Sequence, residues 1–79
     1  KECKAMVKAY YIKRNHYDFT DKDGKHIVGN NIDCFCDGDI VRARCNDEQY
    51  KALASAKFGD IVELDVRVKG KFAKYILAN

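Results

Sequence analysis

The chain has 79 residues, of which 47% are hydrophobic and 34% are charged, and its formal net charge is +3. This length allows one core, so we expect a single domain over residues 1–79, and the composition argues against intrinsic disorder. No apolar run approaches the roughly 20 residues that span a bilayer, and no segment has the order of a secretory signal peptide. The sequence therefore predicts a cytoplasmic protein that makes no membrane contact.

The first half of the chain predicts two strands and two turns. Apolar and polar residues alternate from Cys3 to Ile12, a period of two that indicates a half-buried strand. Asp21–Gly24 is typical of a turn, because Asp tolerates and Gly prefers a positive φ. A second strand is expected over Lys25–Cys36, with a bulge or sharp bend at Gly29–Asn31, and Asp37–Asp39 predicts the next turn.

A third strand and a helix follow. Ile40–Cys45 alternates as a strand should, and Asn46 then has the position of a helix N-cap with Gln49 at the capping-box position. The helix is expected over Asp47–Phe58 and is stopped by Gly59. Its apolar stripe is formed by Tyr50, Leu53, Ala54 and Phe58.

The last part of the chain predicts a hairpin. Asp60–Lys69 alternates without interruption, and the segment Phe72–Ala78 returns after Gly70-Lys71. A two-residue loop that begins with Gly favours a type II′ turn. The predicted order of elements is therefore β-β-β-α-β-β.

This order predicts an all-β fold with one helix, a five-stranded OB-fold-like barrel. Five mostly antiparallel strands with one helix cannot bury both faces of a flat sheet, whereas a closed barrel with the helix at its open end hides the inner face. An α+β sandwich, with the helix across an open sheet, is the alternative.

The hairpin register predicts which side chains reach solvent. With a two-residue loop, Lys69 lies opposite Phe72 and Arg67 lies opposite Lys74. Opposed residues share a face, so one face is basic and the other is apolar. The apolar, inward face is expected to contain Leu64, Val66, Val68, Ala73, Tyr75 and Leu77.

The basic face has the composition of a binding site for single-stranded nucleic acid. Arg67, Lys69, Lys71 and Lys74 surround Phe72, and no acidic residue follows Arg67. Such sites combine cations that follow the phosphates with rings that stack on bases. The like charges of Arg67 and Lys74, directly opposite one another, destabilise the hairpin by up to about 1 kcal/mol. An anion bound between them would make the same pair stabilising. A ring that contacts a partner subunit, or folds back on the barrel, is the alternative for Phe72.

Further candidate contacts come from the other strands and from the first loop. OB barrels bind ligands on the face of their second and third strands and through the loops that join strands one to two and four to five. Phe19 is expected in the first of these loops, Asp18–Lys25, and Phe35 faces outward if its neighbours at positions 34 and 36 face inward. The remaining candidates on the first and third strands are Lys4, Lys8, Tyr10, Arg42 and Arg44.

Other chemistries fit the sequence less well. Cys34 and Cys36 are separated by one residue, which differs from the spacing of zinc knuckles, so small core residues are favoured over a metal site. Ser55 and Thr20 are the only hydroxyl residues besides tyrosine, and no phosphate-binding glycine loop is present. We expect no enzymatic activity, no metal and no cofactor.

The segment from Val66 to Leu77, VRVKGKFAKYIL, resembles the last hairpin of the filamentous-phage helix-destabilising proteins, OB-fold proteins that bind single-stranded DNA. FTDKDGKHI, which begins at Phe19, and the later Cys34-Phe35 are similar to that family's basic loop and second strand. The expected helix is stronger than that family usually has. The resemblance implies that Phe72 stacks on bases, as Phe19 and Phe35 also would, and that Lys69, Lys71 and Lys74 contact the backbone.

The sequence therefore predicts a protein that binds single-stranded DNA with low sequence specificity, in replication or transfer of a phage or plasmid-like element. Its partners would be single-stranded DNA and replication or recombination proteins, with a homodimer as one option. A protein-interaction module of the same fold and a single-stranded RNA-binding module are the alternatives.

Overall fold

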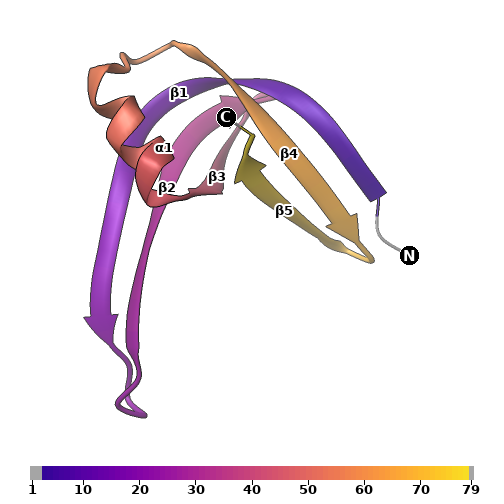
Figure 1. Cartoon of the computed structure of the whole chain (residues 1–79). Coiled ribbons are helices and arrows are strands. Elements are labelled where there is room, and N and C mark those ends of the chain that lie inside the picture. Colours follow the sequence, from indigo (N-terminus) through magenta and orange to yellow (C-terminus); the bar gives the residue numbers. More distant parts are fainter. Residues whose placement is uncertain (1–2, 79) are drawn as a thin grey trace.

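The structure is a computed structural model that describes the backbone of residues 3–78 and the side chains of residues 5–78. The strands and helices follow the predicted order β-β-β-α-β-β (Figure 1). They are β1 (Cys3–Thr20), β2 (His26–Cys36), β3 (Asp39–Cys45), α1 (Asp47–Ala52) with a 3-10 turn (Leu53–Ser55), β4 (Ile61–Lys69) and β5 (Phe72–Leu77).

The five strands form a closed barrel in the order β1-β2-β3-β5-β4. Four of the ladders are antiparallel, and β3 joins β5 in parallel through only two residue pairs, Ala43 with Tyr75 and Arg44 with Ile76. The predicted OB-like barrel is confirmed, and the open α+β sandwich is excluded because the sheet closes. In the part of the chain that is described, neither helical segment has the length and apolar character that crossing a membrane requires.

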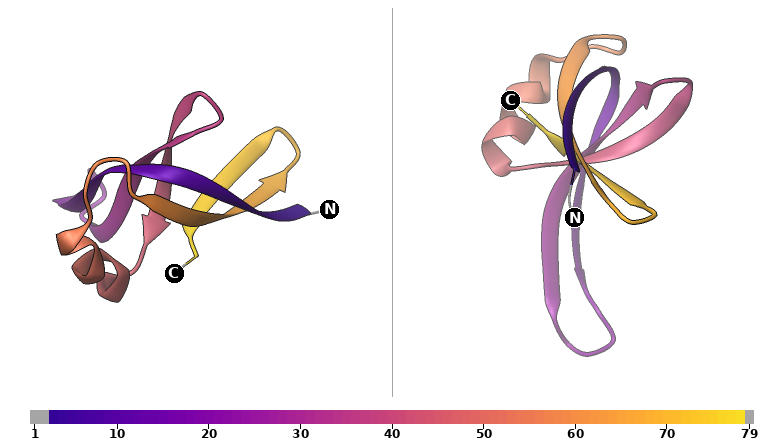
Figure 2. Two further views of the ribbon diagram at one scale, coloured as in Figure 1. Left: turned by 90° about the horizontal axis from the view of Figure 1, so that it is seen from above. Right: turned by 90° about the vertical axis from the view of Figure 1, so that its right-hand side faces the viewer.

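β1 is much longer than predicted, ending at Thr20 rather than at Ile12. Its first half pairs with β4, and its second half pairs with β2 and continues beyond the barrel as a two-stranded arm (Figures 1 and 2). The register shifts between Tyr11 and Lys13, so the bulge lies at Ile12. The bulge predicted at Gly29–Asn31 is wrong, because β2 pairs with β1 without interruption there. A bulge bends its strand, which suits the point where β1 passes from one neighbour to the other.

Gly29 allows a close approach of the Tyr17 side chain. It pairs with Tyr17, whose ring lies over it, and a Cβ at Gly29 would stand 2.8 Å from Cε2 of that ring and closer still to Cζ and Oη. Only glycine leaves this space free.

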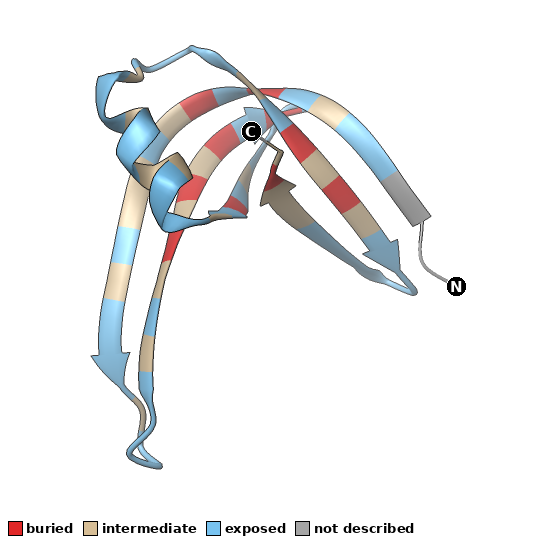
Figure 3. Cartoon of the chain, in the orientation of Figure 1, coloured by how far each residue is buried: buried red, intermediate tan, exposed pale blue. Residues whose placement is uncertain are grey.

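The core lies where the two halves of the barrel face one another (Figure 3). Ile32, Leu64 and Cys34 are its largest fully buried side chains, and Leu53 and Ala56 from the helical segment pack against it. The helix thus covers one end of the barrel, as expected. Val68 and Ala73 were predicted to face inward but are exposed, because the tip of the β4–β5 hairpin extends past the core.

The helix is shorter than predicted, although its beginning was predicted correctly. Asn46 and Gln49 form both hydrogen bonds of the capping box. Regular helix ends at Ala52, and Phe58 is 80% exposed rather than part of a buried stripe. The backbone N–H of Gly59 donates to the Tyr11 carbonyl, and Asp60 accepts from the Tyr11 N–H. These bonds to β1 require the chain to leave the helix before Phe58.

Three side-chain hydrogen bonds attach the helix to the barrel and to the base of the arm. Asn30, the only buried polar residue among those described, accepts from His16 Nδ1 and donates to Asp47. Arg14 donates to the Tyr50 carbonyl at 2.6 Å and lies over its ring, and Gln49 donates to the Leu77 carbonyl at 3.0 Å. The face of β1 that carries Arg14 and His16 therefore lies toward the helix.

Candidate nucleic-acid interface

The β4–β5 hairpin has the predicted register. Lys69 pairs with Phe72, Arg67 with Lys74, and Val66 with Tyr75. Gly70 has a φ of 61°, the left-handed value that the first loop position of a type II′ turn requires. The backbone therefore places Phe72 and three of the predicted cations on the outer face of the hairpin.

Phe72 is 81% exposed at the tip of this hairpin. A ring this exposed does not fold back on the barrel, which excludes one alternative for it. Most of the residue is therefore open to solvent, and a nucleic-acid base can stack on an aromatic ring exposed in this way.

The charge around the ring is almost entirely positive. Lys69, Lys71 and Lys74 are exposed, while Arg67 is half-buried. Arg67 Nη2 lies 3.4 Å from Asp65 Oδ2, and its buried Nε has no hydrogen-bond partner within residues 5–78. The protein thus supplies a carboxylate of its own beside Arg67, which reduces the repulsion from Lys74 before any ligand binds.

The two β3 arginines lie next to this hairpin across the β3–β5 junction. Arg44 pairs directly with Ile76 of β5 and is exposed. Arg42 is also exposed, but its Nε donates to Asp33 Oδ1 at 3.1 Å, which partly neutralises it. Arg44 therefore extends the basic surface of the hairpin more effectively than Arg42.

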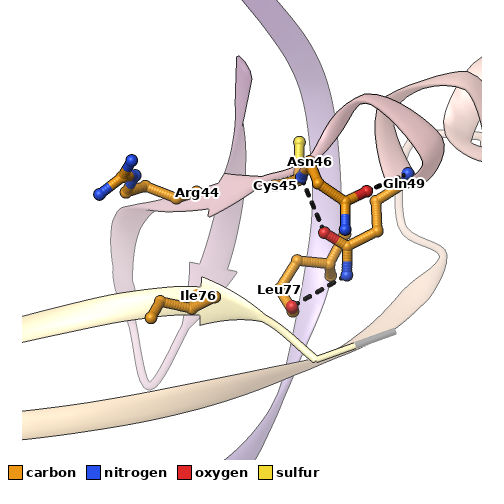
Figure 4. Close-up of a pocket in the computed structure, with 6 residues that line it drawn as sticks. All are labelled: Arg44, Cys45, Asn46, Gln49, Ile76 and Leu77. Carbon is orange, nitrogen blue, oxygen red and sulfur yellow. Dashed lines mark hydrogen bonds between the residues drawn. The ribbon is translucent and has the colours of Figure 1, made fainter. Parts of the chain in front are cut away.

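A hollow of about 380 Å³ lies beside Arg44, where β3 and β5 meet the start of the helix. Figure 4 shows the capping box of Asn46 and Gln49 on one side of it and Arg44 extending away from the helix on the other. Cys45, Ile76 and Leu77 complete its lining. The side-chain oxygens of Asn46 and Gln49 each accept from the backbone N–H of the other residue, and Gln49 Nε2 donates to the Leu77 carbonyl. These bonds occupy the polar groups that line the hollow, and Arg44 is the one cation in its lining.

Tyr10 and Phe35, predicted as stacking residues, are directly opposite one another on β1 and β2. Both are exposed, and Phe35 faces outward because Cys34 and Cys36 are buried, as the prediction required. Lys8 lies opposite Glu63 on β4, so the charge at this position has a carboxylate on the neighbouring strand, unlike Lys69 opposite Phe72. Lys4 pairs with Arg67 through the backbone, and its side chain lies outside the described residues.

Phe19 lies in a strand and not in a loop. It pairs with Ile27 on the arm, is half-exposed, and has its ring centroid 6.4 Å from that of Tyr17. The connecting loop is shorter than the predicted Asp18–Lys25, because β1 continues to Thr20. Tyr17, which was not among the predicted contacts, lies opposite Gly29 on the same arm, and its ring covers the glycine backbone there.

The predicted residues therefore form separate groups instead of one site. The arm and the β4–β5 hairpin leave the barrel in different directions, so Phe19 and Phe72 lie on different projections (Figures 1 and 2). Tyr10 and Phe35 lie on the barrel wall between them. The hairpin group is the one in which an exposed ring coincides with exposed lysines that form no ion pair within residues 5–78.

The three thiols that the structure describes, Cys34, Cys36 and Cys45, all have pKa values raised above the ordinary value. Burial, followed by the charge of Asp33, raises the pKa of Cys34 to about 11, and burial also raises the pKa values of Cys36 and Cys45. A protonated thiol is a poor nucleophile and a poor metal ligand. Within residues 5–78 no three His, Cys, Asp or Glu side chains come together as a metal site would require.

Comparison with protein-family models, with curated proteins and with solved structures finds no match to this chain.

Proposed function

We propose that the protein binds single-stranded DNA with low sequence specificity through the β4–β5 hairpin. Phe72 would stack on a base, and Arg67, Lys69, Lys71 and Lys74 would follow the phosphates. The observation that carries this proposal is an aromatic ring, 81% exposed, whose nearest charged residues along the hairpin, Lys69, Lys71 and Lys74, are all cations. Binding would be electrostatic tracking with stacking, without a chemical reaction.

The strand would pass from the hairpin tip over Arg44 and the adjoining wall of the barrel toward the aromatic face of the arm. Arg44 lies on the strand next to β5, and Tyr17 and Phe19 form an aromatic pair on β1 beyond it. This path joins the two projections of the barrel. It agrees with the resemblance of the hairpin to the filamentous-phage helix-destabilising proteins, and on that basis we propose a role in copying or transferring a mobile element.

The first experiment measures fluorescence anisotropy of labelled single-stranded DNA, single-stranded RNA and duplex DNA at two salt concentrations. Each phosphate neutralised contributes a slope of about 0.7 in log K against log salt, so the four hairpin cations predict a slope of about 3. A stronger affinity for RNA would change the proposal to RNA binding, and absence of binding to all three would remove it.

The second experiment removes the ring. Phe72→Ala is expected to weaken single-stranded DNA binding roughly 5- to 150-fold, since stacking contributes about 1–3 kcal/mol per base. Phe58→Ala is the matched control, because Phe58 is 80% exposed but lies at the opposite end of β4. Equal effects of the two substitutions would contradict a specific role for Phe72.

A further inference from the structure

The helix α1 and the base of the arm enclose a second hollow, away from the β4–β5 hairpin. Its volume is about 410 Å³, which is within the usual range of small-ligand sites. α1 lies against β1 and β2 at this point, where the arm leaves the barrel (Figure 1). The lining combines two cations, a histidine, an amide, an aromatic ring and one acid, and consists of Arg14, His16, Asn30, Asp47, Tyr50 and Lys51.

The hydrogen bonds behind the hollow fix the proton on the His16 ring. A carboxylate can only accept, so the Asn30 group that lies 2.7 Å from Asp47 Oδ1 is the amide nitrogen. The Asn30 oxygen then faces His16 Nδ1, also at 2.7 Å, and this oxygen requires a donor, so Nδ1 carries the hydrogen. In the neutral ring Nε2 is therefore a hydrogen-bond acceptor.

Nε2 lies at the end of this ring that a ligand can reach. Nδ1 is turned toward Asn30, which is 5% exposed, whereas His16 itself is exposed. The solvent-facing part of the ring is therefore its Nε2 side. Holding one ring nitrogen by a hydrogen bond is how proteins orient the other one toward a ligand.

Arg14 and Lys51 give the hollow an excess of positive charge. Neither forms an ion pair within residues 5–78, and Asp47 is the one acid in the lining. Arg14 Nη1 donates to the Tyr50 carbonyl at 2.6 Å, and its Cζ lies 4.3 Å from the centroid of the Tyr50 ring, so the guanidinium is held in place. The centroid of the His16 ring lies 6.0 Å from the same point.

An acceptor nitrogen beside two cations restricts the chemistry of the ligand. The ligand must present a hydrogen-bond donor with a negative charge close to it. Arg14 and His16 are two residues apart on one face of β1, about 6.6 Å at 3.3 Å per residue, so these two ligand groups must be near neighbours. A ribonucleoside 3′-phosphate has such a pair on adjacent carbon atoms, the 2′-hydroxyl and the phosphate. A DNA strand lacks the 2′-hydroxyl, and the amino groups of its bases lie on the far side of the base from the phosphate.

We infer that this hollow binds one ribonucleoside 3′-phosphate, either free or as a residue of an RNA chain. The 2′-hydroxyl donates to His16 Nε2, and the phosphate lies between Arg14 and Lys51. Asn30 and Asp47 are positioning residues, because they act through the ring of His16. The site distinguishes ribose from deoxyribose, since the 2′-hydroxyl is the group that tells RNA from DNA.

The proton on His16 can be tested directly, because the chain contains two histidines and the second is an internal reference. His26 Nε2 bonds to Asp18 Oδ1, so its proton belongs on Nε2, the opposite of His16. Long-range nitrogen–proton correlation NMR at about pH 8, where imidazole is neutral, distinguishes the two forms. The Nδ1–H form is expected for His16 and the Nε2–H form for His26. An Nε2–H form at His16 would overturn the inference, because Nε2 could then not accept.

Titration with two nucleotides that differ by one hydroxyl group tests the site. Adenosine 3′-monophosphate should shift the ring signals of His16 and bind about two- to tenfold more tightly than 2′-deoxyadenosine 3′-monophosphate, which lacks one hydrogen bond. The signals of His26 should stay unchanged. Equal affinities, equal shifts at the two histidines, or absence of binding of both nucleotides would overturn the inference.

The dinucleotide adenylyl-3′,5′-adenosine distinguishes the two sources of the ligand. Its 2′-hydroxyl lies beside a phosphodiester, whereas the phosphate of the mononucleotide is a monoester of higher charge. Tighter binding of the dinucleotide would support an RNA chain as the ligand, and tighter binding of the mononucleotide would support a free nucleotide.

Lys51→Gln tests the phosphate contact, and Lys57→Gln is the matched control, because Lys57 is an exposed lysine outside the lining. Each substitution removes one positive charge. Lys51→Gln should weaken binding of adenosine 3′-monophosphate about two- to fivefold, the range of an exposed ion pair, and Lys57→Gln should leave it unchanged. Equal effects of the two substitutions would overturn the placement of the phosphate.

Asp47→Asn tests the positioning of the ring. An amide at this position can donate as well as accept, so the Asn30 amide is no longer fixed, and His16 should become a mixture of its two ring forms in the correlation spectra. The preference for the 2′-hydroxyl should fall with it. A ring that stays entirely in the Nδ1–H form would overturn the role of Asp47.

This inference is independent of the proposed binding of single-stranded DNA, because the hollow shares no residue with the β4–β5 hairpin. Phe72→Ala should weaken DNA binding but leave the nucleotide-induced shift of His16 unchanged. A preference for RNA that survives Phe72→Ala would support the hollow, whereas one that is lost with the ring would belong to the hairpin. The two proposals can therefore fail separately.

Discussion

At Gly29 the missing side chain leaves room for the ring of Tyr17, which crosses the strand there. Both residues lie on the arm, outside the buried core. An exposed two-stranded ribbon is marginally stable by itself, so a ring that covers a bare glycine backbone contributes directly to its order.

A double-mutant cycle checks this contact. Gly29→Ala should lower the free energy of unfolding by about 1 kcal/mol, because the new Cβ displaces the ring. In a Tyr17→Ala background the same change should be neutral or stabilising, since Ala is a better strand residue than Gly. Urea unfolding gives both values, and additive effects would contradict the contact.

Cys34 makes stability depend on alkaline pH. Its folded pKa is raised from 9.0 to about 11, so the unfolded chain loses this proton first as pH rises. The stabilisation is fully present below pH 9 and is lost progressively toward pH 11, by at most about 2.7 kcal/mol at 1.36 kcal/mol per pKa unit.

Urea unfolding between pH 8 and pH 11 checks this dependence. Cys34→Ala should lower stability at pH 8, because it leaves a small cavity, but should show a shallower decline above pH 9. Parallel declines in the native chain and the variant would assign the pH effect to other groups, such as Tyr11, whose pKa is also raised by burial.

Among the elements, α1 depends most on its first residues. It has six residues, none of them buried, and a helix of this length does not form by itself in water. Asn46→Ala removes an N-cap side chain and should lower the free energy of unfolding by about 1 kcal/mol. Asn46→Asp should retain most of the capping stabilisation, because Asp is also a favoured N-cap residue. Thermal unfolding measures both. Ser55→Ala is the control, because Ser55 is exposed at the end of the 3-10 turn, and it should change the free energy of unfolding little. If Ser55→Ala lowered stability as much as Asn46→Ala, the loss at Asn46 could not be assigned to capping.

The register of the β4–β5 hairpin was predicted to the residue, because adjacent residues in the sequence determine it. A strict period of two and a glycine at the loop leave one register, and that register fixed the face of Phe72. The end of the helix was not predictable in this way. The bonds from Gly59 and Asp60 to Tyr11 join positions far apart in the chain, and they override the apolar spacing that pointed to Phe58.

At the scale of the whole molecule, the barrel followed from the order of elements and the need to hide one sheet face. The arrangement of the candidate site residues could be predicted from the sequence only in part. Tyr10 was predicted as a candidate contact, yet its alignment with Ile61, Phe35 and Ile40 depends on the registers of three separate ladders. The β1–β4 ladder joins distant segments without a tight turn, so nothing local specifies its register.

The extra residue at Ile12 changes the parity of β1. Before it, odd-numbered side chains such as Ala9 and Tyr11 face the core, and after it even-numbered ones such as Arg14 and His16 face the helix side. Deleting one residue there would exchange the two faces of the arm in a single step. The arm's aromatic side would then turn toward α1, and the residues that anchor the helix would turn toward solvent.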